Sequence, residues 1–176
     1  MSWSKEKDIK KFILNNNEEF IERYLDKILF GNEYHNTKIE YIGSEVMTGN
    51  GLKRCDLLYK VDWFDPIIIV VELKQEIDTN SFIQLCNYIN EFKKSHIIEN
   101  VFDKKLYPFG QCFRYYGVLV GKYLRSSAKE LIESELSHSI SYVDFYNSEF
   151  FRFADRQAYY YKNDDFECNK LLWQGE

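Results

Sequence analysis

Two neighbouring runs of branched and aromatic residues, Lys53–Val61 and Ile67–Lys74, constrain the fold of this chain more than any other feature of its sequence. Each run is long enough for a strand, and the turn-forming residues Asp65 and Pro66 separate them. We therefore predict an antiparallel hairpin with its turn centred on Phe64. Because side chains on a strand alternate between two faces, the register of this hairpin decides which residues meet.

The predicted register gives the hairpin one apolar face and one mixed face. The apolar face carries Cys55, Leu57, Tyr59, Val61, Ile67, Ile69, Val71 and Leu73. On the mixed face, Asp56 lies directly opposite Glu72, and Arg54 lies opposite Lys74. Opposed carboxylates with β-carbons about 5 Å apart repel each other and would weaken a sheet whose role is only structural.

A divalent cation between Asp56 and Glu72 would remove this repulsion. Carboxylate oxygens, joined by a backbone carbonyl, suit a hard cation such as Mg²⁺, which usually takes one or two protein carboxylates and keeps several waters. Lys74 stands two residues after Glu72 and points to the same face. The hairpin therefore predicts a metal site with a lysine beside it.

Helical positions on both sides of the hairpin are expected to reach the mixed face. Gln84 and Tyr88 are four residues apart, and they flank the apolar stripe of a helix predicted from about Thr79 to Lys94. Near the start of the chain, Glu6 falls on the apolar stripe of the first predicted helix, so we expect its carboxylate to look inward. An ordinary surface pair between Glu6 and Lys10 is the alternative for that residue.

The rest of the sequence predicts helices around a mixed sheet. The further predicted elements are short helices around 9–13 and 20–29, strands over 39–48, 115–123 and 140–146, and a helix over 128–136. We therefore predict an α/β fold in which a mixed β-sheet is flanked by α-helices. One domain is expected to span residues 1–176, with a core over about 4–146 and a C-terminal extension, 147–176, that adds an edge strand.

Three motifs in succession resemble the signature of a known superfamily. Arg54-Cys55-Asp56, Glu72-Leu73-Lys74 and the Gln84 to Tyr88 spacing are similar, in order and separation, to the R-x-D, E-x-K and Q-x-x-x-Y motifs of PD-(D/E)XK nucleases. In particular, the chain resembles the nuclease domain of NucS/EndoMS-type mismatch endonucleases. Segments 6–13, 117–120 and 128–131 resemble the first helix, a late strand and a late helix of that domain.

This resemblance implies a restriction-endonuclease-like core and a Mg²⁺- or Mn²⁺-dependent endonuclease acting on DNA. Its metal ligands would be Asp56, Glu72 and the backbone carbonyl of Leu73. The catalytic residues implied by the motifs are Asp56, Glu72, Lys74, Gln84 and Glu6, and the substrate-binding residues are Arg54 and Tyr88. The family's separate N-terminal β-rich dimerisation domain has no counterpart in this sequence, so the resemblance does not imply mismatch specificity.

Composition excludes several other classes of protein. A net charge of −5 argues against a protein that coats nucleic acid non-specifically. The four cysteines and three histidines are scattered without the spacing of a zinc site or a redox dithiol. The longest apolar run, Ile67–Val71, is far shorter than the roughly 18 to 20 residues of a membrane span. Because the first residues alternate in charge instead of forming a signal peptide, we predict a cytoplasmic protein.

Several alternatives stay open at this level. The motifs are also compatible with a catalytically inactive module of the same fold that binds nucleic acid or a protein partner. We expect a homodimer or a complex with a partner subunit, because one acidic domain would grip duplex DNA weakly and cut only one strand. The motifs do not distinguish DNA from RNA, or single from double strands, as the substrate. They also do not distinguish a role in defence, in a mobile element or in repair. We expect the segment 94–114 to contact substrate or a partner.

Overall fold

The computed structural model describes residues 5–31, 36–49, 53–63, 65–95, 97–102, 113–134, 140–146, 149–154 and 157–162. Within these ranges, seven strands form one sheet in which the order of the strands follows the order of the chain. The strands are β1 (Ile39–Met47), β2 (Arg54–Val61), β3 (Ile67–Ile77), β4 (Arg114–Leu124), β5 (Ile140–Asp144), β6 (Glu149–Ala154) and β7 (Gln157–Lys162). The helices are α1 (Glu6–Asn15), α2 (Asn17–Phe20), the π-helix η1 (Ile21–Leu25), α3 (Asp26–Phe30), α4 (Thr79–Ser95), the 3₁₀-helix η2 (Ile97–Val101) and α5 (Ser126–Ser134).

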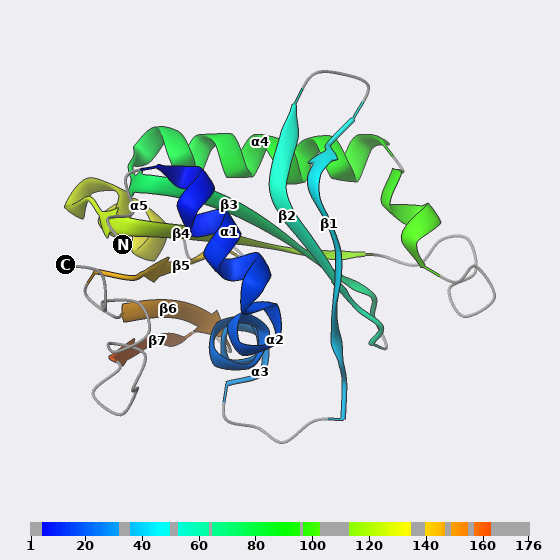
Figure 1. Cartoon of the computed structure of the whole chain (residues 1–176), viewed down its shortest axis with the longest axis horizontal. Helices are drawn as coiled ribbons and strands as arrows, with labels where there is room; N and C mark the ends of the chain where they lie inside the picture. The colour runs from blue at the N-terminus through cyan, green and yellow to red at the C-terminus, as the bar shows by residue number, and fades with distance from the viewer. Residues whose placement is uncertain are drawn as a thin grey trace.

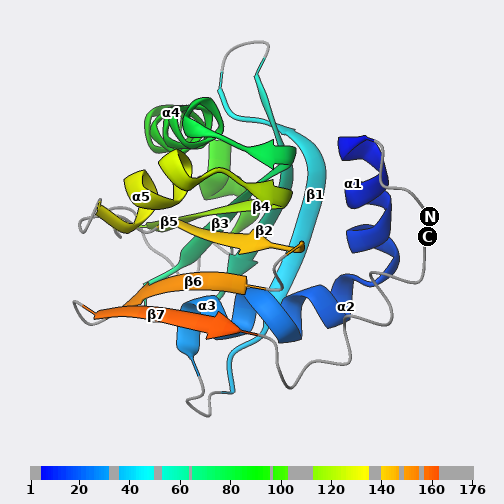
Figure 2. The same cartoon turned by 90° about the vertical axis from the view of Figure 1, so that its left-hand side faces the viewer.

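The sheet is mixed, as the sequence predicts. β1, β2 and β3 form an antiparallel meander, β3, β4 and β5 are parallel to one another, and β6 and β7 return antiparallel. Parallel neighbours need a long crossover connection, and helices α4 and α5 lie in the two crossovers. Figures 1 and 2 show α4 and α5 over one face of the sheet and α1, α2 and α3 over the other. The predicted α/β fold class is confirmed.

Both faces of the sheet are buried. On the side of α1 to α3, the core consists of residues such as Ile9, Ile13, Leu57, Tyr59, Ile69, Val71 and Leu73. On the side of α4 and α5, it consists of residues such as Leu58, Ile68, Val70, Leu85, Phe92 and Leu119. The central strand β3 is buried continuously from Ile67 to Leu73 because helices cover it on both sides.

The predicted register of the hairpin is confirmed from Leu57 paired with Val71 to Val61 paired with Ile67. The turn residue Phe64 lies outside the described residues. One assignment to the apolar face is wrong, because Cys55 lies in the core on the side of α4. On the N-terminal side of Leu57, β2 is no longer paired with β3 but stays paired with β1 as far as Arg54. The alternation of side chains extrapolated from the hairpin therefore gives the wrong face for Cys55.

The C-terminal extension contributes more than the single edge strand that the sequence predicts. Strands β6 and β7 both join the sheet beyond β5, and β7 forms its edge. Residues 163–176 of the extension, and residues 103–112 of the segment expected to contact substrate, lie outside the described ranges. In the part of the chain that the structure describes, no helix is long and apolar enough to cross a membrane.

Gly121 of β4 leaves no room for a side chain beside β3. A β-carbon there would lie 2.7 Å from Cγ1 of Ile77 and 3.0 Å from the backbone oxygen of Lys74. We predict that Gly121→Ala lowers the free energy of unfolding by about 1 to 3 kcal/mol, because the buried side chain of Ile77 must shift and the backbone oxygen of Lys74 leaves little room. Gly43→Ala is the control, since its β-carbon would meet only Cγ2 of Val46 at 3.4 Å. Urea unfolding checks this, and equal midpoints for both variants would contradict it.

Candidate metal and catalytic site

Asp56 and Glu72 converge where β2 separates from β3. The last ladder pair is Leu57 with Val71, so the two carboxylates are not opposed across regular β-pairing as predicted. Instead, Oδ2 of Asp56 accepts a hydrogen bond of 2.8 Å from the backbone N–H of Leu73. The carboxylate of Asp56 therefore supplies the acceptor for this N–H group of β3, next to Glu72.

Glu72 is buried, and its two carboxylate oxygens have different environments. The residue is 2% exposed. Nζ of Lys74 donates a hydrogen bond of 2.8 Å to Oε1. Oε2 is buried, and within the described ranges no group donates a hydrogen bond to it. A buried carboxylate oxygen without a donor costs free energy, so this atom is a natural place for a cation to bind.

The electrostatic state of Glu72 reflects this environment. Burial, and after it the negative charge of Asp56, raises the pKa of Glu72 to about 7, although Lys74 acts in the opposite direction. A carboxyl group with such a pKa is partly protonated near neutral pH in the metal-free protein. A divalent cation would stabilise the ionised form of both carboxylates.

Lys74 is held by Glu72 and remains a cation. Burial alone would lower the pKa of its ammonium group, but the hydrogen bond to Glu72 and the charges of Glu72, Glu6 and Asp56 outweigh this and raise it. Its side chain is partly exposed, so a polar group from solvent or substrate can reach it. Lys74 therefore binds the buried carboxylate of Glu72 and remains accessible from the surface of the molecule.

Glu6 does not look inward as the sequence predicts. It is the first residue of α1 and is exposed, whereas Ile9 and Ile13 farther along the same stripe are buried. The first turn of a helix favours acidic side chains in solvent, where they face the positive end of the helix dipole. The charge of Glu6 nevertheless contributes to the raised pKa of Lys74, which places Glu6 at the rim of the site.

Gln84 and Tyr88 come from α4 on the side of the sheet where Glu72 lies. Nε2 of Gln84 donates a hydrogen bond to the hydroxyl of Tyr88. Tyr88 is buried, and burial raises the pKa of its hydroxyl, with the charges of Glu72 and Asp56 adding to that effect. The structure therefore brings both helical residues to the site that the sequence assigned them.

Arg54 is not opposite Lys74 as predicted. It is exposed at the start of β2 and pairs with Met47 of β1. Among the described residues, no hydrogen bond or ion pair joins its guanidinium group to the other residues of the site. The predicted role of the Leu73 carbonyl also stays a prediction, because the structure shows the N–H of Leu73, not its carbonyl, bonded within the site.

Cys55 is a neighbour that sequence reasoning missed. Burial, together with the charges of Glu72 and Asp56, raises the pKa of its thiol to about 12. The thiol therefore stays protonated near neutral pH and is an uncharged neighbour of the two carboxylates. Its place directly before Asp56 was the available signal, but alternation along β2 assigned it to the other face.

The two carboxylates would give a bound metal ion only two side-chain ligands. Within the described residues, no group of three or more histidine, cysteine, aspartate and glutamate side chains could hold a metal ion. Mg²⁺ does not need such a group, because it usually binds one or two carboxylates and completes its shell with water and phosphate oxygens. Asp56 and the orphaned Oε2 of Glu72 fit that requirement.

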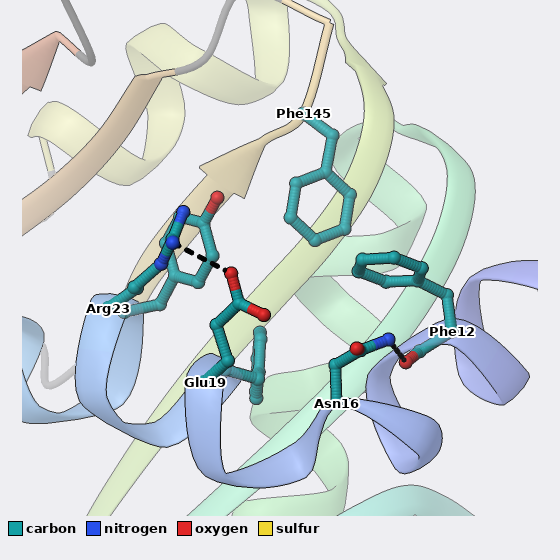
Figure 3. A pocket seen from close by; sticks show the side chains of 7 residues that line it. Phe12, Asn16, Glu19, Arg23 and Phe145 are labelled. Atoms are coloured by element: carbon teal, nitrogen blue, oxygen red, sulfur yellow. Dashed lines mark hydrogen bonds and ion pairs between the residues drawn. The ribbon is translucent and has the colours of Figure 1, made fainter. Parts of the chain in front are cut away.

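A pocket on the opposite face of the sheet does not offer comparable chemistry. It is lined by Phe12, Asn16, Glu19, Phe20, Arg23, Tyr24 and Phe145 (Figure 3). Its carboxylate, Glu19, pairs with Arg23 at 2.9 Å, and Nδ2 of Asn16 donates to the backbone oxygen of Phe12. The remaining lining is aromatic, so the site around Glu72 is the stronger candidate for a functional site.

No protein-family model matches this chain, and no curated protein matches it. Two solved structures are similar to it. A repair endonuclease from Pyrococcus abyssi shares 19% identity with a TM-score of 0.46, and the match covers 75% of this chain and 46% of that one. EndoMS in complex with double-stranded DNA shares 21% identity with a TM-score of 0.42, covering 74% of this chain and 44% of that one. This chain spans less than half the length of each of these two proteins.

Proposed function

We propose that this protein is a metal-dependent nuclease that hydrolyses phosphodiester bonds of DNA. The observation that carries the proposal is the buried Oε2 of Glu72, which has no hydrogen-bond partner among the described residues and lies beside a second carboxylate and a lysine. A structural ion pair between Glu72 and Lys74 would not require Asp56, whose charge makes the ionised form of Glu72 less favourable. A site that binds a cation explains all three residues.

Asp56 and Glu72 would hold Mg²⁺ or Mn²⁺, with the carbonyl of Leu73 as a further proposed ligand. When bound, such a cation supplies Lewis acidity at the phosphate and lowers the pKa of an attacking water. Lys74 would orient that water and offset negative charge at phosphorus. The raised pKa of its ammonium group favours this donor role over that of a general base.

The outer residues would bind the DNA backbone and fix the inner ones. Arg54 offers an exposed guanidinium fork two residues before Asp56, and such a fork suits a phosphate. Gln84 and Tyr88 would hold the site from α4 through their mutual hydrogen bond. Glu6 contributes negative charge at the rim, close enough to raise the pKa of Lys74.

The direct test incubates purified protein with linear, circular and single-stranded DNA in Mg²⁺, Mn²⁺ or EDTA. We expect cleavage that requires the divalent cation. Binding of DNA without cleavage in either metal would favour the alternative, an inactive module of the same fold. Measurement of the mass in solution tests the proposed homodimer or partner complex separately.

Gln84→Ala is predicted to lower the cleavage rate by about 10- to 100-fold without unfolding the protein, because residues that orient a metal site typically have effects of this size. Asn87→Ala, exposed three residues farther along α4, is the matched control and should cleave like the wild type. Initial rates under saturating Mn²⁺ check this. Equal rates for the two variants would show that Gln84 does not support the site.

A further inference from the structure

The β1–β2 hairpin extends beyond the sheet and crosses α4 (Figure 1). The ladder between β2 and β3 ends at Leu57, whereas β1 and β2 continue to pair as far as Met47 with Arg54. We call residues 47–49 and 53–56 the hairpin arm. The arm carries Arg54 and Asp56, so two residues of the proposed site stand on a segment that ladder pairing with β3 does not hold.

Glu91 of α4 binds both sides of this arm, at the residue after β1 and the residue before β2. Its Oε2 accepts a hydrogen bond of 2.5 Å from the hydroxyl of Thr48, and its Oε1 accepts one of 3.0 Å from Nζ of Lys53. One turn later on α4, the hydroxyl of Ser95 donates to the backbone oxygen of Thr48 at 3.1 Å. A backbone hydrogen bond from Thr48 to Lys53 closes the arm itself.

An ionised glutamate at position 91 suits these contacts. Thr48 is fully buried, and its hydroxyl donates to Glu91 at 2.5 Å, with the backbone oxygen of Lys53 at 3.4 Å as a second, more distant acceptor. The hydrogen bonds from Thr48 and Lys53 lower the pKa of Glu91, which keeps the carboxylate charged. A β-carbon on Gly49 would lie 3.9 Å from Cβ of Glu91, so the backbone of the arm lies directly against the helix.

The same helix carries the other supporting residues of the site. Tyr88 lies one turn before Glu91, and Gln84 lies one turn before Tyr88. An α-helix is stiff over this length, so α4 sets the distance between Tyr88 and the point where the arm is attached. Asp56 is then held at two places, by the N–H of Leu73 and by the attachment of its own arm to α4.

We propose that Glu91 is a positioning residue that fastens the hairpin arm to α4 and thereby keeps Asp56 beside Glu72. The catalytic consequence rests on the proposed nuclease function, whereas the placement of Asp56 does not. Loss of Glu91 should let the arm move away from β3. Asp56 would then leave both the N–H of Leu73 and the neighbouring carboxylate.

The experiment compares Glu91→Ala and Glu91→Gln with the wild type. Asp65→Asn is the matched control, because it removes an exposed carboxylate that binds Arg114 at the opposite end of β2 and β3. In the metal-free protein, hydrogen exchange of the Leu73 amide should be about tenfold faster or more in Glu91→Ala and unchanged in Asp65→Asn. Glu91→Gln keeps an acceptor for Thr48 but loses the charge that binds Lys53, so an intermediate rate is expected.

A second readout separates positioning from general stability. In Glu91→Ala, affinity for Mn²⁺ without DNA should fall about tenfold, and kcat for cleavage about 10- to 100-fold, while KM for DNA changes less than about twofold. Wild-type Leu73 exchange and wild-type Mn²⁺ affinity in this variant would overturn the proposal.

If Glu91→Ala does not fold, Glu91→Gln and a Lys53→Gln variant, which changes an exposed residue, are judged by the same two measurements. If the wild type does not cleave DNA, the nuclease function fails, and the exchange of Leu73 still decides the role of Glu91.

Discussion

Glu72→Gln and Lys74→Ala are each expected to reduce DNA cleavage by about a thousandfold or more. Glu72→Gln removes the charge that would bind the cation, and Lys74→Ala removes the donor that would orient water and offset charge at phosphorus. Single groups that stabilise charge in a transition state commonly contribute this much, because they act in a site from which water is excluded. Glu72 satisfies that condition, since it is almost completely buried.

The matched control for both variants is Glu76→Gln. Glu76 stands two residues after Lys74 on β3, but it is exposed and pairs with Arg125 at 2.6 and 2.8 Å. We expect this variant to cleave like the wild type. Circular dichroism and urea unfolding establish that all three variants are folded. Wild-type rates in a folded Glu72→Gln or Lys74→Ala protein would refute the proposed site.

The metal-free protein is expected to lose stability as the pH rises from about 5 to about 8, by an amount of order 2 to 3 kcal/mol from Glu72 alone. Its pKa is about 7 in the folded state against 4.5 for the ordinary group. The folded state therefore retains a proton that the unfolded chain releases. The stabilising contribution is fully present below pH 4.5 and is lost as the pH rises through about 7.

Asp56→Asn should reduce the loss of stability between pH 5 and 8, because it removes a charge that raises the pKa of Glu72. The asparagine oxygen can still accept the hydrogen bond from Leu73. In EDTA at pH 8, we expect the variant to be as stable as the wild type or more stable by a few tenths to about 1 kcal/mol. The stabilisation that Mn²⁺ gives the wild type should disappear with the ligand.

Urea unfolding of the wild type, Asp56→Asn and Glu72→Gln in EDTA from pH 5 to 8, repeated with Mn²⁺, checks both statements. Glu72→Gln should lack the pH-dependent loss. An Asp56→Asn variant that is less stable by about 1 to 3 kcal/mol in EDTA and responds normally to Mn²⁺ would instead show a structural ion pair at Asp56.

The central strands of the fold were predictable from local sequence. Alternation of apolar residues and the turn near Pro66 placed Leu57 opposite Val71, and the structure has that register. The three-and-four spacing of apolar residues likewise predicted α4, with Gln84 and Tyr88 on the side of the site. Such patterns are reliable because each residue of a regular element has a fixed direction relative to its neighbours in the chain.

The end of the β2–β3 ladder was not predictable in this way. Whether Asp56 continues the ladder depends on its hydrogen bond to Leu73, on β1, and on the attachment of Thr48 to Glu91 of α4. The two hydrogen-bonded pairs lie 17 and 43 residues apart in the chain. The assignment of Cys55 to the wrong face follows from the same cause, because alternation carries no information about where a strand leaves its neighbour.

Local patterns were sufficient to predict the antiparallel pairing of the hairpin and the approach of Asp56 and Lys74 to Glu72. They could not show that Glu6 is exposed at the rim, or that one oxygen of Glu72 is buried without a hydrogen-bond partner among the described residues. Periodicity reports which side of an element faces the core, whereas burial, hydrogen bonding and pKa depend on contacts between elements that are distant in the chain. For that reason the motif could indicate the chemistry of this site, and only the fold could show how its carboxylates are held together.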